Sequence, residues 1–235
     1  MRWLVLGLLA LAQEAAADCT RMTFEDVPMA VCEAKAGDDL RLFLKDANGQ
    51  PYGGFGPVDR ALAPRRLVWA MNAGMYQPDL SPVGLYIEDG VQAHGLVTRD
   101  GPGNFGLLPN GVFCIGKRFS VVESRAFKVD PPECRYASQS GPMLVIEGAL
   151  HPSFKPDSDS LNIRNGVGVS KDGKTAWFVL SEQRVNFDRF ARFFRDALGA
   201  RDALYFDGSI SRLYAPEIGR QGGGFAIGPI VGVVE

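Results

Sequence analysis

The 235-residue sequence contains only two histidines, His94 and His151, and its 25 basic residues are nearly balanced by 27 acidic ones. Metal-dependent phosphodiesterases gather several Asp and His ligands around their ions, so the shortage of histidine argues against that class. We therefore expect no cofactor, although a single Ca²⁺ or Mg²⁺ held by carboxylates stays open. Since no stretch of the chain forms a basic stripe, we also expect no nucleic-acid partner.

Several signatures of enzyme families are also missing. The chain has no Gly-x-Ser-x-Gly nucleophile elbow and no phosphate-binding P-loop, and the run at 222–224 does not lie between a predicted strand and a predicted helix. These absences argue against a serine hydrolase of that type and against a dinucleotide-binding enzyme. The sequence has no internal repeat and no low-complexity linker, so a single domain over residues 18–235 is expected.

The N-terminus has the pattern of a secretory signal peptide. A positive residue is followed by an apolar stretch at 4–12, which is too short to span a bilayer, and then by three alanines ending at Ala17. Cleavage after Ala17 predicts a mature chain, 18–235, that is soluble and periplasmic or secreted, with no transmembrane segment. Lipidation of Cys19 is the alternative, and Asp18 argues against it because a small residue is expected at that position.

Four cysteines, Cys19, Cys32, Cys114 and Cys134, make an even number in a chain that is expected to be exported. An even count in that setting indicates two disulfides, and four cysteines allow three connectivities. We favour the two local pairings, Cys19–Cys32 and Cys114–Cys134. A zinc site is the competing interpretation, but the sequence lacks a close Cys-x-x-Cys spacing.

Short strands and tight turns dominate the pattern, in keeping with 28 glycines and 15 prolines. Turn signals at 89–90, 116–117 and 171–174 each separate two apolar runs, which predicts three hairpins. One helix is expected over residues 187–198, where phenylalanines recur at helical spacing after the N-cap residue Asn186. These elements predict an α+β fold: a single domain with a large mixed β-sheet and few helices.

Charged residues at strand ends are the first candidates for chemistry. Asp207 follows the apolar run 203–206, where a carboxylate projects from a sheet edge, and Gly208 lets a ligand approach the backbone closely. Arg164 precedes a predicted strand, and its guanidinium could hold a phosphate through two hydrogen bonds. Each has a plainer interpretation, because Asp-Gly is a common turn and Arg164 could form a surface salt bridge. Glu182 is a weaker second carboxylate.

Polar segments beside other predicted strands are candidates for binding. Asn72 follows the apolar run 66–71 and could donate to a ligand or form an Asx-turn. Residues 138–142 are expected to form a polar loop, in which Gln139 and the following amides bind sugar hydroxyls or phosphate oxygens, or simply face solvent. Further polar residues that could line a pocket are Asn104, Asn110 and Asn162.

Seven segments, in this order, carry a resemblance to a known family: 72–76, 82–86, 103–105, 109–113, 139–142, 164–168 and 207–209. Together they resemble the phosphodiester glycosidase family, from about Leu67 to the C-terminus, and look most similar to a bacterial branch of exported proteins. Better-studied members have a glycine where this chain has Ala73, an aromatic residue where it has Met75, and more glycines after Gly208. The pocket near Asp207 should therefore be bulkier.

The resemblance implies a hydrolase that breaks the bond between a sugar's anomeric carbon and a phosphodiester oxygen. Its transition state should resemble an oxocarbenium ion. A departing phosphate monoester, with a second pKa of about 6, needs positive charge more than it needs a proton. Asp207 is then expected to activate water or attack the anomeric carbon, Arg164 to hold the phosphate, and Glu182 to act as a reserve carboxylate. The expected substrate-binding residues are Asn72, Gly74, Gln139, Ser140, Gly141, Gly208 and Ser209.

The partner implied by the resemblance is a small-molecule or polymeric glycan phosphodiester. Two other functions stay open: a non-catalytic protein that binds glycans or cell-wall polymers, and a metal-dependent phosphodiesterase that cuts the phosphate ester. Tight pairing of Asp207 with Arg164 would favour the binding protein, because neither group would then be available to a substrate.

Overall fold

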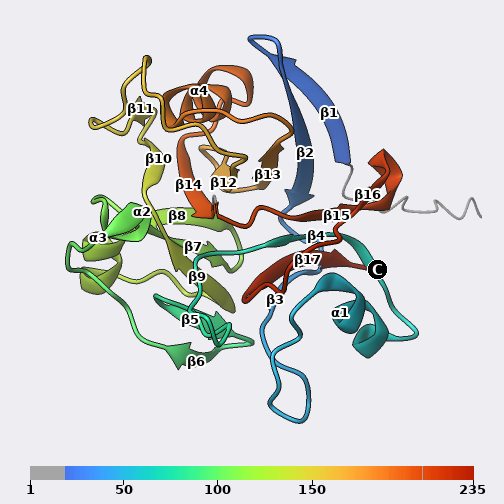
Figure 1. Cartoon of the computed structure of the whole chain (residues 1–235). Coiled ribbons are helices and arrows are strands. Elements are labelled where there is room, and N and C mark those ends of the chain that lie inside the picture. Colours follow the sequence, from blue (N-terminus) through green and yellow to red (C-terminus); the bar gives the residue numbers. More distant parts are fainter. Residues whose placement is uncertain (1–18, 208) are drawn as a thin grey trace, which may run out of the picture.

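The computed structural model describes residues 19–207 and 209–235 (Figure 1). The predicted signal peptide, residues 1–17, and Gly208 lie outside the described residues. Within the described ranges, no helix combines the length and apolar character needed to cross a bilayer.

The largest sheet has seven strands in the order β1-β2-β13-β12-β14-β10-β11. Its strands in chain order are β1 (Cys19–Phe24), β2 (Val27–Lys35), β10 (Met143–Ile146), β11 (Ala149–Leu150), β12 (Asn165–Val169), β13 (Thr175–Ser181) and β14 (Asp202–Asp207). The central strands β12, β13 and β14 are buried over most of their length. The sheet therefore delivers the C-terminal residue of β14, Asp207, from a well-packed interior.

Two five-stranded sheets complete the fold. The second sheet has the order β16-β15-β4-β17-β3, with β3 (Leu40–Phe43), β4 (Leu67–Asn72), β15 (Leu213–Ala215), β16 (Arg220–Gln221) and β17 (Ile230–Val234). The third sheet has the order β6-β5-β9-β7-β8, with β5 (Tyr86–Glu88), β6 (Val91–His94), β7 (Gly111–Ile115), β8 (Phe119–Glu123) and β9 (Tyr136–Ser140).

The helices are short and lie outside the sheets (Figure 1). They are α1 (Phe55–Leu62), α2 (Gly103–Gly106), α3 (Ser124–Val129), α4 (Phe187–Arg192), the π-helical turn η1 (Phe193–Ala197) and the 3₁₀ turn η2 (Pro216–Ile218). Helix α4 with η1 covers the seven-stranded sheet, α1 lies against β4, and α3 lies beside β7 and β8.

The α+β class and the single domain agree with the sequence analysis, but the expected mixed sheet is replaced by three sheets whose paired strands are antiparallel. The reason lies in the connections. Hairpins join β1 to β2, β5 to β6, β7 to β8 and β12 to β13. A parallel pair needs a crossover of a dozen or more residues, whereas a short turn returns the chain antiparallel.

The local predictions agree closely with the structure. All three predicted hairpins form, and at the turn between β5 and β6 both Asp89 (φ 50°) and Gly90 (φ 80°) adopt the left-handed conformation that a type I′ turn requires. The predicted helix begins after Asn186, whose side chain accepts a hydrogen bond from the Arg189 amide at 2.9 Å. The helix widens into the π-helical turn η1 before ending.

The prediction of a polar loop at 138–142 is wrong. Residues up to Ser140 form β9, a strand between β5 and β7 that is buried along its whole length. Its polar side chains are tolerated there because each finds a hydrogen-bond partner inside the protein.

Aromatic residues from all three sheets meet in a shared core. The Trp69 ring of β4 lies 4.8 Å from Phe178 of β13, and Phe113 of β7 lies 5.6 Å from Phe178 and 6.4 Å from Phe206 of β14. All four side chains are fully buried. Because Phe206 is fixed in this core, the neighbouring Asp207 is held at a defined place where the sheets meet.

Both predicted disulfides are present. Cys19 pairs with Cys32, directly opposite it on the β1–β2 hairpin, and Cys114 of β7 pairs with Cys134. The described residues contain no free cysteine.

We expect the double variant Cys19→Ala/Cys32→Ala to lose about 3 kcal/mol of unfolding free energy, because the crosslink limits the unfolded chain. Urea denaturation of the variant and the parent chain measures this difference. Non-reducing peptide mapping of exported protein should recover both crosslinked peptides. Four titratable thiols in that material would contradict the assignment.

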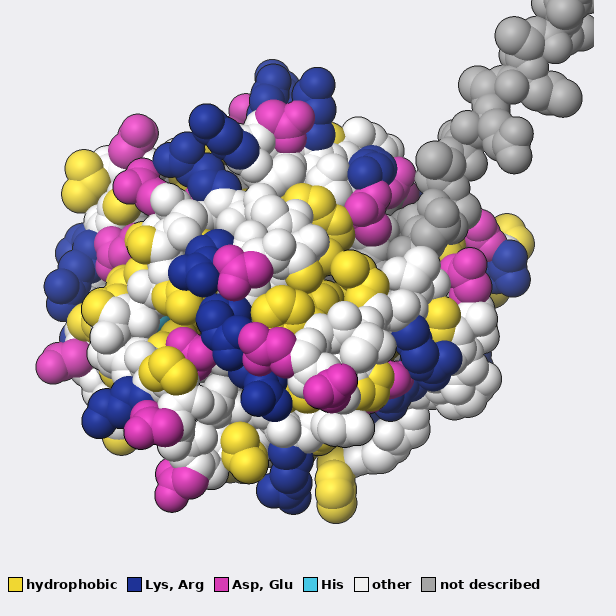
Figure 2. Space-filling model, turned by 90° about the horizontal axis from the view of Figure 1, so that it is seen from above, with side chains coloured by type: hydrophobic (Ala, Val, Ile, Leu, Met, Phe, Trp, Pro, Cys, Tyr) yellow, Lys and Arg dark blue, Asp and Glu magenta, His cyan; other side chains and the backbone are white. Residues whose placement is uncertain are grey.

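Basic and acidic side chains are intermixed on the molecular face shown in Figure 2. Many of the arginines form an ion pair with a nearby carboxylate, as Arg41 and Arg65 both do with Asp39. A single-sign patch that would attract a polyanion is therefore not seen on this face.

Candidate functional site

Three strand ends come together where the seven-stranded sheet meets the second sheet. Asn72 ends β4, Asn165 begins β12, and Asp207 ends β14. Asn165 and Asp207 are directly opposite each other in the ladder between β12 and β14. The side chains of Asn72 and Asn165 are fully buried, and Asp207 is 9% exposed. Polar groups therefore replace apolar packing at this junction.

Asn165 connects the two sheets through its side-chain amide. Its Nδ2 donates to both the Oδ1 and the main-chain oxygen of Asn72, each at 2.9 Å, and its Oδ1 accepts from the Asp207 amide at 3.0 Å. Asn72 in turn accepts from the Arg212 amide at 2.8 Å and donates to the carbonyl of Ile210 at 2.8 Å. The segment after Asp207 is thus fixed from both sheets.

Two serines complete the turn around Asp207. The amide of Ser209 donates to Asp207 Oδ1 at 2.9 Å, and the hydroxyl of Ser211 donates to the Asp207 carbonyl at 2.8 Å. Ser211 Oγ also lies 3.3 Å from Asn165 Oδ1. These contacts form the turn that was the plainer interpretation of Asp207. They also orient the carboxylate of Asp207.

Strand β9 supports this junction from the third sheet. Ser138 donates to the carbonyl of Ala73 at 2.7 Å, and Ser140 donates to the carbonyl of Phe206 at 2.8 Å. Gly74 has φ +99°, and a Cβ there would lie 2.7 Å from the Ser138 hydroxyl. Only glycine suits that position, since the conformation and the space both disfavour a side chain. Of the predicted binding residues, Gly74 and Ser140 thus lie beside Asn72 and Asp207.

Gln139 projects to the other face of β9, as strand alternation requires. Its Oε1 accepts from the amides of Leu85 and Val97 at 3.0 Å each, and its Nε2 donates to the Val97 carbonyl and to Ser124 Oγ at 2.5 and 2.8 Å. The side chain therefore fastens neighbouring loops to β9 instead of pointing toward Asp207.

Gly141, next in the chain, packs against Asn110. A Cβ at Gly141 would lie 2.5 Å from the Asn110 Cβ. Asn110 is fully buried and donates to the Phe105 carbonyl at 2.9 Å. Close packing therefore accounts for a glycine at position 141, and its role in binding stays a prediction.

Arg164 is fully buried, so the alternative of a surface salt bridge is wrong. Its guanidinium donates to the carbonyls of Val185 and Ser160 at 2.9 and 2.8 Å and to the Tyr205 hydroxyl at 3.3 Å, and it lies 3.6 Å above the Phe187 ring. Burial lowers the pKa of this guanidinium. The residue immediately precedes Asn165, the first residue of β12, and its donors are turned toward the protein.

Glu182 belongs to a different cluster. It accepts hydrogen bonds from Arg21 of β1 at 3.2 Å and from Arg220 of β16 at 2.5 Å. Partial burial acts to raise the pKa of Glu182, and the hydrogen bonds from Arg220 and Arg21 outweigh it, so the pKa lies below its usual value. Glu182 thus ties β1 to the start of the glycine-rich segment that precedes β17.

Tyr76 is a residue of this site that the sequence did not single out. Its hydroxyl donates to the Ala226 carbonyl at 3.2 Å. Burial, together with the charge of Asp207 and against that of Arg212, raises the pKa of Tyr76 to about 12. Burial also raises the pKa of Tyr205 to about 12, with Arg164 acting to lower it and Asp207 to raise it. Both phenols near Asp207 therefore stay protonated at neutral pH.

A cleft of about 300 Å³ lies beside the Asp207 turn. It is lined by Leu180, by the segment from Ser211 to Leu213, and by the segment from Gly219 to Gly223. Ser211 both lines the cleft and bonds Asp207 and Asn165. The volume is at the lower end of that of small-ligand sites.

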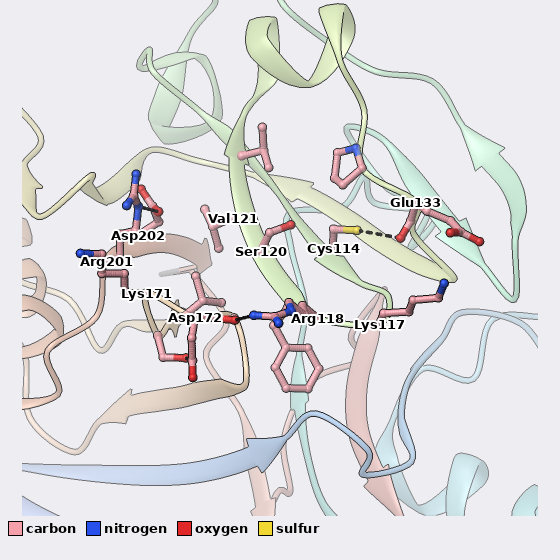
Figure 3. A pocket seen from close by; sticks show the side chains of 16 residues that line it. Cys114, Lys117, Arg118, Ser120, Val121, Glu133, Lys171, Asp172, Arg201 and Asp202 are labelled. Atoms are coloured by element: carbon pink, nitrogen blue, oxygen red, sulfur yellow. Dashed lines mark hydrogen bonds and ion pairs between the residues drawn. The ribbon is translucent and has the colours of Figure 1, made fainter.

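Another cavity, of about 610 Å³, lies at the opposite ends of β12 and β14 (Figure 3). Its lining includes Val169 and Asp202, the residues farthest along those strands from Asn165 and Asp207, together with Arg118, which donates to the Asp172 carbonyl at 2.6 Å. It is separate from the site around Asp207.

Metal-ligating side chains do not cluster in the described ranges: no group of three or more His, Cys, Asp or Glu residues there could hold an ion. His94 Nδ1 lies 2.9 Å from the Gly84 carbonyl, and His151 Nε2 lies 3.0 Å from the Leu108 carbonyl. Burial lowers the pKa of His151.

Comparison with known proteins gives one family and several related folds. The family model described as phosphodiester glycosidase matches residues 65–225. The uncharacterized protein YigE of Escherichia coli K12 is 37% identical over 214 residues, which cover 90% of this chain and 84% of YigE.

Solved structures resemble the fold at low identity. The zebrafish N-acetylglucosamine-1-phosphodiester α-N-acetylglucosaminidase catalytic domain, auto-inhibited by its pro-peptide, has a TM-score of 0.64 at 14% identity, covering 95% of this chain and 85% of that chain. A hypothetical protein from Synechocystis has a TM-score of 0.61 at 14% identity. The match covers 92% of this chain and 61% of the Synechocystis chain. At these identities the two structures support the fold.

Proposed function

This chain belongs to the phosphodiester glycosidase family, and from that premise we propose that it hydrolyses the bond between the anomeric carbon of a sugar and a phosphodiester oxygen. The observation that carries the proposal is the placement of Asp207. Its carboxylate ends a core strand, is oriented by the Ser209 amide, and lies in a network that joins two sheets through Asn165. Such rigid positioning is what a group that acts on a reacting atom requires.

Asp207 would act at the anomeric carbon. As that carbon gains positive charge, a carboxylate nearby either takes the proton of an attacking water or forms the covalent bond itself. The bond to phosphate breaks, its electron pair stays on the phosphate oxygen, and the oxygen of water ends on the sugar. The products are a free sugar and a phosphate monoester.

The departing phosphate needs positive charge and hydrogen-bond donors. Arg212 lines the cleft beside Ser211, and the Tyr76 phenol, protonated at neutral pH, lies near both Asp207 and Arg212. We assign the phosphate to this side of the site. Arg164 is then a buried positive charge at the start of β12, the strand that pairs with β14. It holds Tyr205 and β12 in place beside Asp207.

We also propose that the protein acts outside the cytoplasm, after removal of residues 1–17. Two disulfides support this, because such crosslinks persist in oxidising compartments and are rare in the cytosol. Fractionation of producing cells, with the N-terminal residue determined on the mature protein, tests the assignment. A cytosolic chain that retains its first residues would contradict it.

We expect the purified protein to convert the methyl phosphodiester of N-acetylglucosamine 1-phosphate into N-acetylglucosamine and methyl phosphate. The probe is taken from the reaction that names the zebrafish relative. Phosphorus NMR of the mixture, run with and without a chelator, identifies the phosphate product. N-Acetylglucosamine 1-phosphate plus methanol would indicate a phosphodiesterase, and saturable binding without either product would indicate a binding protein.

A further inference from the structure

A glycine-rich strap presents an exposed aromatic side chain next to the cleft. The strap, residues 222–228, connects β16 to β17 and begins with three glycines. Phe225 is 81% exposed, in a fold whose other phenylalanines are mostly buried. Gly222 (φ +63°) and Gly224 (φ +134°) give the strap the turns that bring Phe225 outward.

The strap is held at several points along its length. Arg212 donates from Nε to the Gly222 carbonyl at 2.7 Å and also donates to the Phe225 carbonyl. Tyr76 donates to the carbonyl of Ala226 at 3.2 Å. Before the strap, Arg220 donates to Glu182 at 2.5 Å. The backbone that carries Phe225 is thus fixed although its ring is exposed.

The residues that hold the strap also belong to the surroundings of Asp207. The main-chain amide of Arg212 donates to Asn72 Oδ1 at 2.8 Å, so Arg212 is part of the hydrogen-bond network around Asp207. Tyr76, whose hydroxyl holds Ala226, is close enough to Asp207 for that charge to raise its pKa. The cleft lies between Ser211 and the segment that runs into the strap. Phe225 therefore lies two residues beyond the cleft lining, on a strap whose first two glycines line the cleft and whose carbonyl at Phe225 is bonded by Arg212.

Single exposed apolar residues are common on protein surfaces and need no special role. Val129, 85% exposed on α3, and Val91, 69% exposed on β6, are examples. Phe225 differs because its main-chain carbonyl is bonded by an arginine that lines a cleft. An aromatic ring on a fixed backbone gives contact area with little loss of conformational entropy on binding.

We propose that Phe225 is the platform on which the pyranose ring of the substrate stacks, with its apolar C–H face against the phenyl ring. The inference rests on the proposed function, since it assigns the sugar to Phe225 and the phosphate to the neighbouring Arg212 and Tyr76, which bond the same strap. The strap thereby selects substrates by their sugar ring. A phosphodiester without a pyranose gains nothing from Phe225.

Steady-state kinetics of two substitutions test the platform. With the methyl phosphodiester of N-acetylglucosamine 1-phosphate, we expect Phe225→Ala to raise KM about tenfold with little change in kcat, because a stacked ring contributes to binding in both ground and transition states. Phe225→Trp should keep the parent KM. Val129→Ala, at an equally exposed residue away from the cleft, is the matched control and should leave both constants unchanged. An unchanged KM for Phe225→Ala would overturn the proposal.

Fluorescence separates this inference from the proposed function. In Phe225→Trp, the exposed indole should change its emission when the same phosphodiester is added, beyond any change in the parent chain, and glycerol phosphate should have no effect. An emission change without turnover by the parent chain would retain the platform and reject the glycosidase. Turnover by the parent chain, with neither an emission change in Phe225→Trp nor a raised KM in Phe225→Ala, would reject the platform and retain the glycosidase.

Discussion

Asp207→Asn is expected to lower kcat about 10³–10⁴-fold and to leave the affinity for the phosphodiester nearly unchanged. Asparagine keeps the shape of the side chain and an oxygen that can accept from the Ser209 amide. It removes the negative charge needed by an attacking water or by the positive anomeric carbon. Rapid-quench or steady-state kinetics, together with equilibrium binding to the variant, measure both quantities.

Asp202 offers a matched control on the same strand. It begins β14, at the far end from Asp207, and its carboxylate accepts from the Glu147 amide at 2.8 Å. Asp202→Asn makes the same chemical change in the same sheet and should leave kcat unaltered. Near-parent turnover by a folded Asp207→Asn variant would mean that this aspartate only forms the turn before Ser209.

Arg164→Met is expected to lower the unfolding free energy by about 3–5 kcal/mol, because it leaves several buried acceptors unpaired. These are the carbonyls of Ser160 and Val185 and the hydroxyl of Tyr205, and the Phe187 ring loses its stacked cation as well. Arg164→Lys retains the charge but not the planar fork and should lose less stability. Urea denaturation of both variants measures the effect.

The same variants test whether Arg164 holds the phosphate directly. If Arg164 contacts the phosphate, Arg164→Met should bind the phosphodiester poorly. The variant should then retain activity on a glycoside whose weakly basic leaving group lacks phosphate. A structural role predicts parallel losses on both substrates, in proportion to stability. Parent-like stability combined with a selective loss of the phosphodiester would contradict the structural role.

Much of the fold was predictable because its signals are local. The turn at Asp89 and Gly90 and the N-cap at Asn186 specify backbone geometry within a few residues of themselves. The disulfide between Cys19 and Cys32 was favoured as a local pairing, and the β1–β2 hairpin, which the sequence analysis did not predict, places the two residues opposite each other. Neither class of signal depends on how the sheets pack.

The contacts around the site were less predictable because they depend on the assembled sheets. Nothing local distinguishes the Ser138–Ser140 stretch from an exposed loop, yet partners on other strands let it become the buried strand β9. Arg164 was expected to be available to a ligand, but carbonyls and rings from β14 and the helix region surround it. Asn165, which bonds both Asn72 and Asp207, belongs to the segment 164–168 that carries the family resemblance, but no local signal singled it out.

Hydrolysis in oxygen-18-labelled water is the most direct test of the central claim, that Asp207 acts at the sugar carbon. The methyl phosphodiester of N-acetylglucosamine 1-phosphate is hydrolysed in this water, and the product is read at phosphorus, where an attached heavy oxygen shifts the NMR signal. Cleavage at the anomeric carbon predicts methyl phosphate without the label, formed by the parent chain and lost in Asp207→Asn. Label on the phosphate, or unlabelled product formed equally fast by Asp207→Asn, would contradict the account.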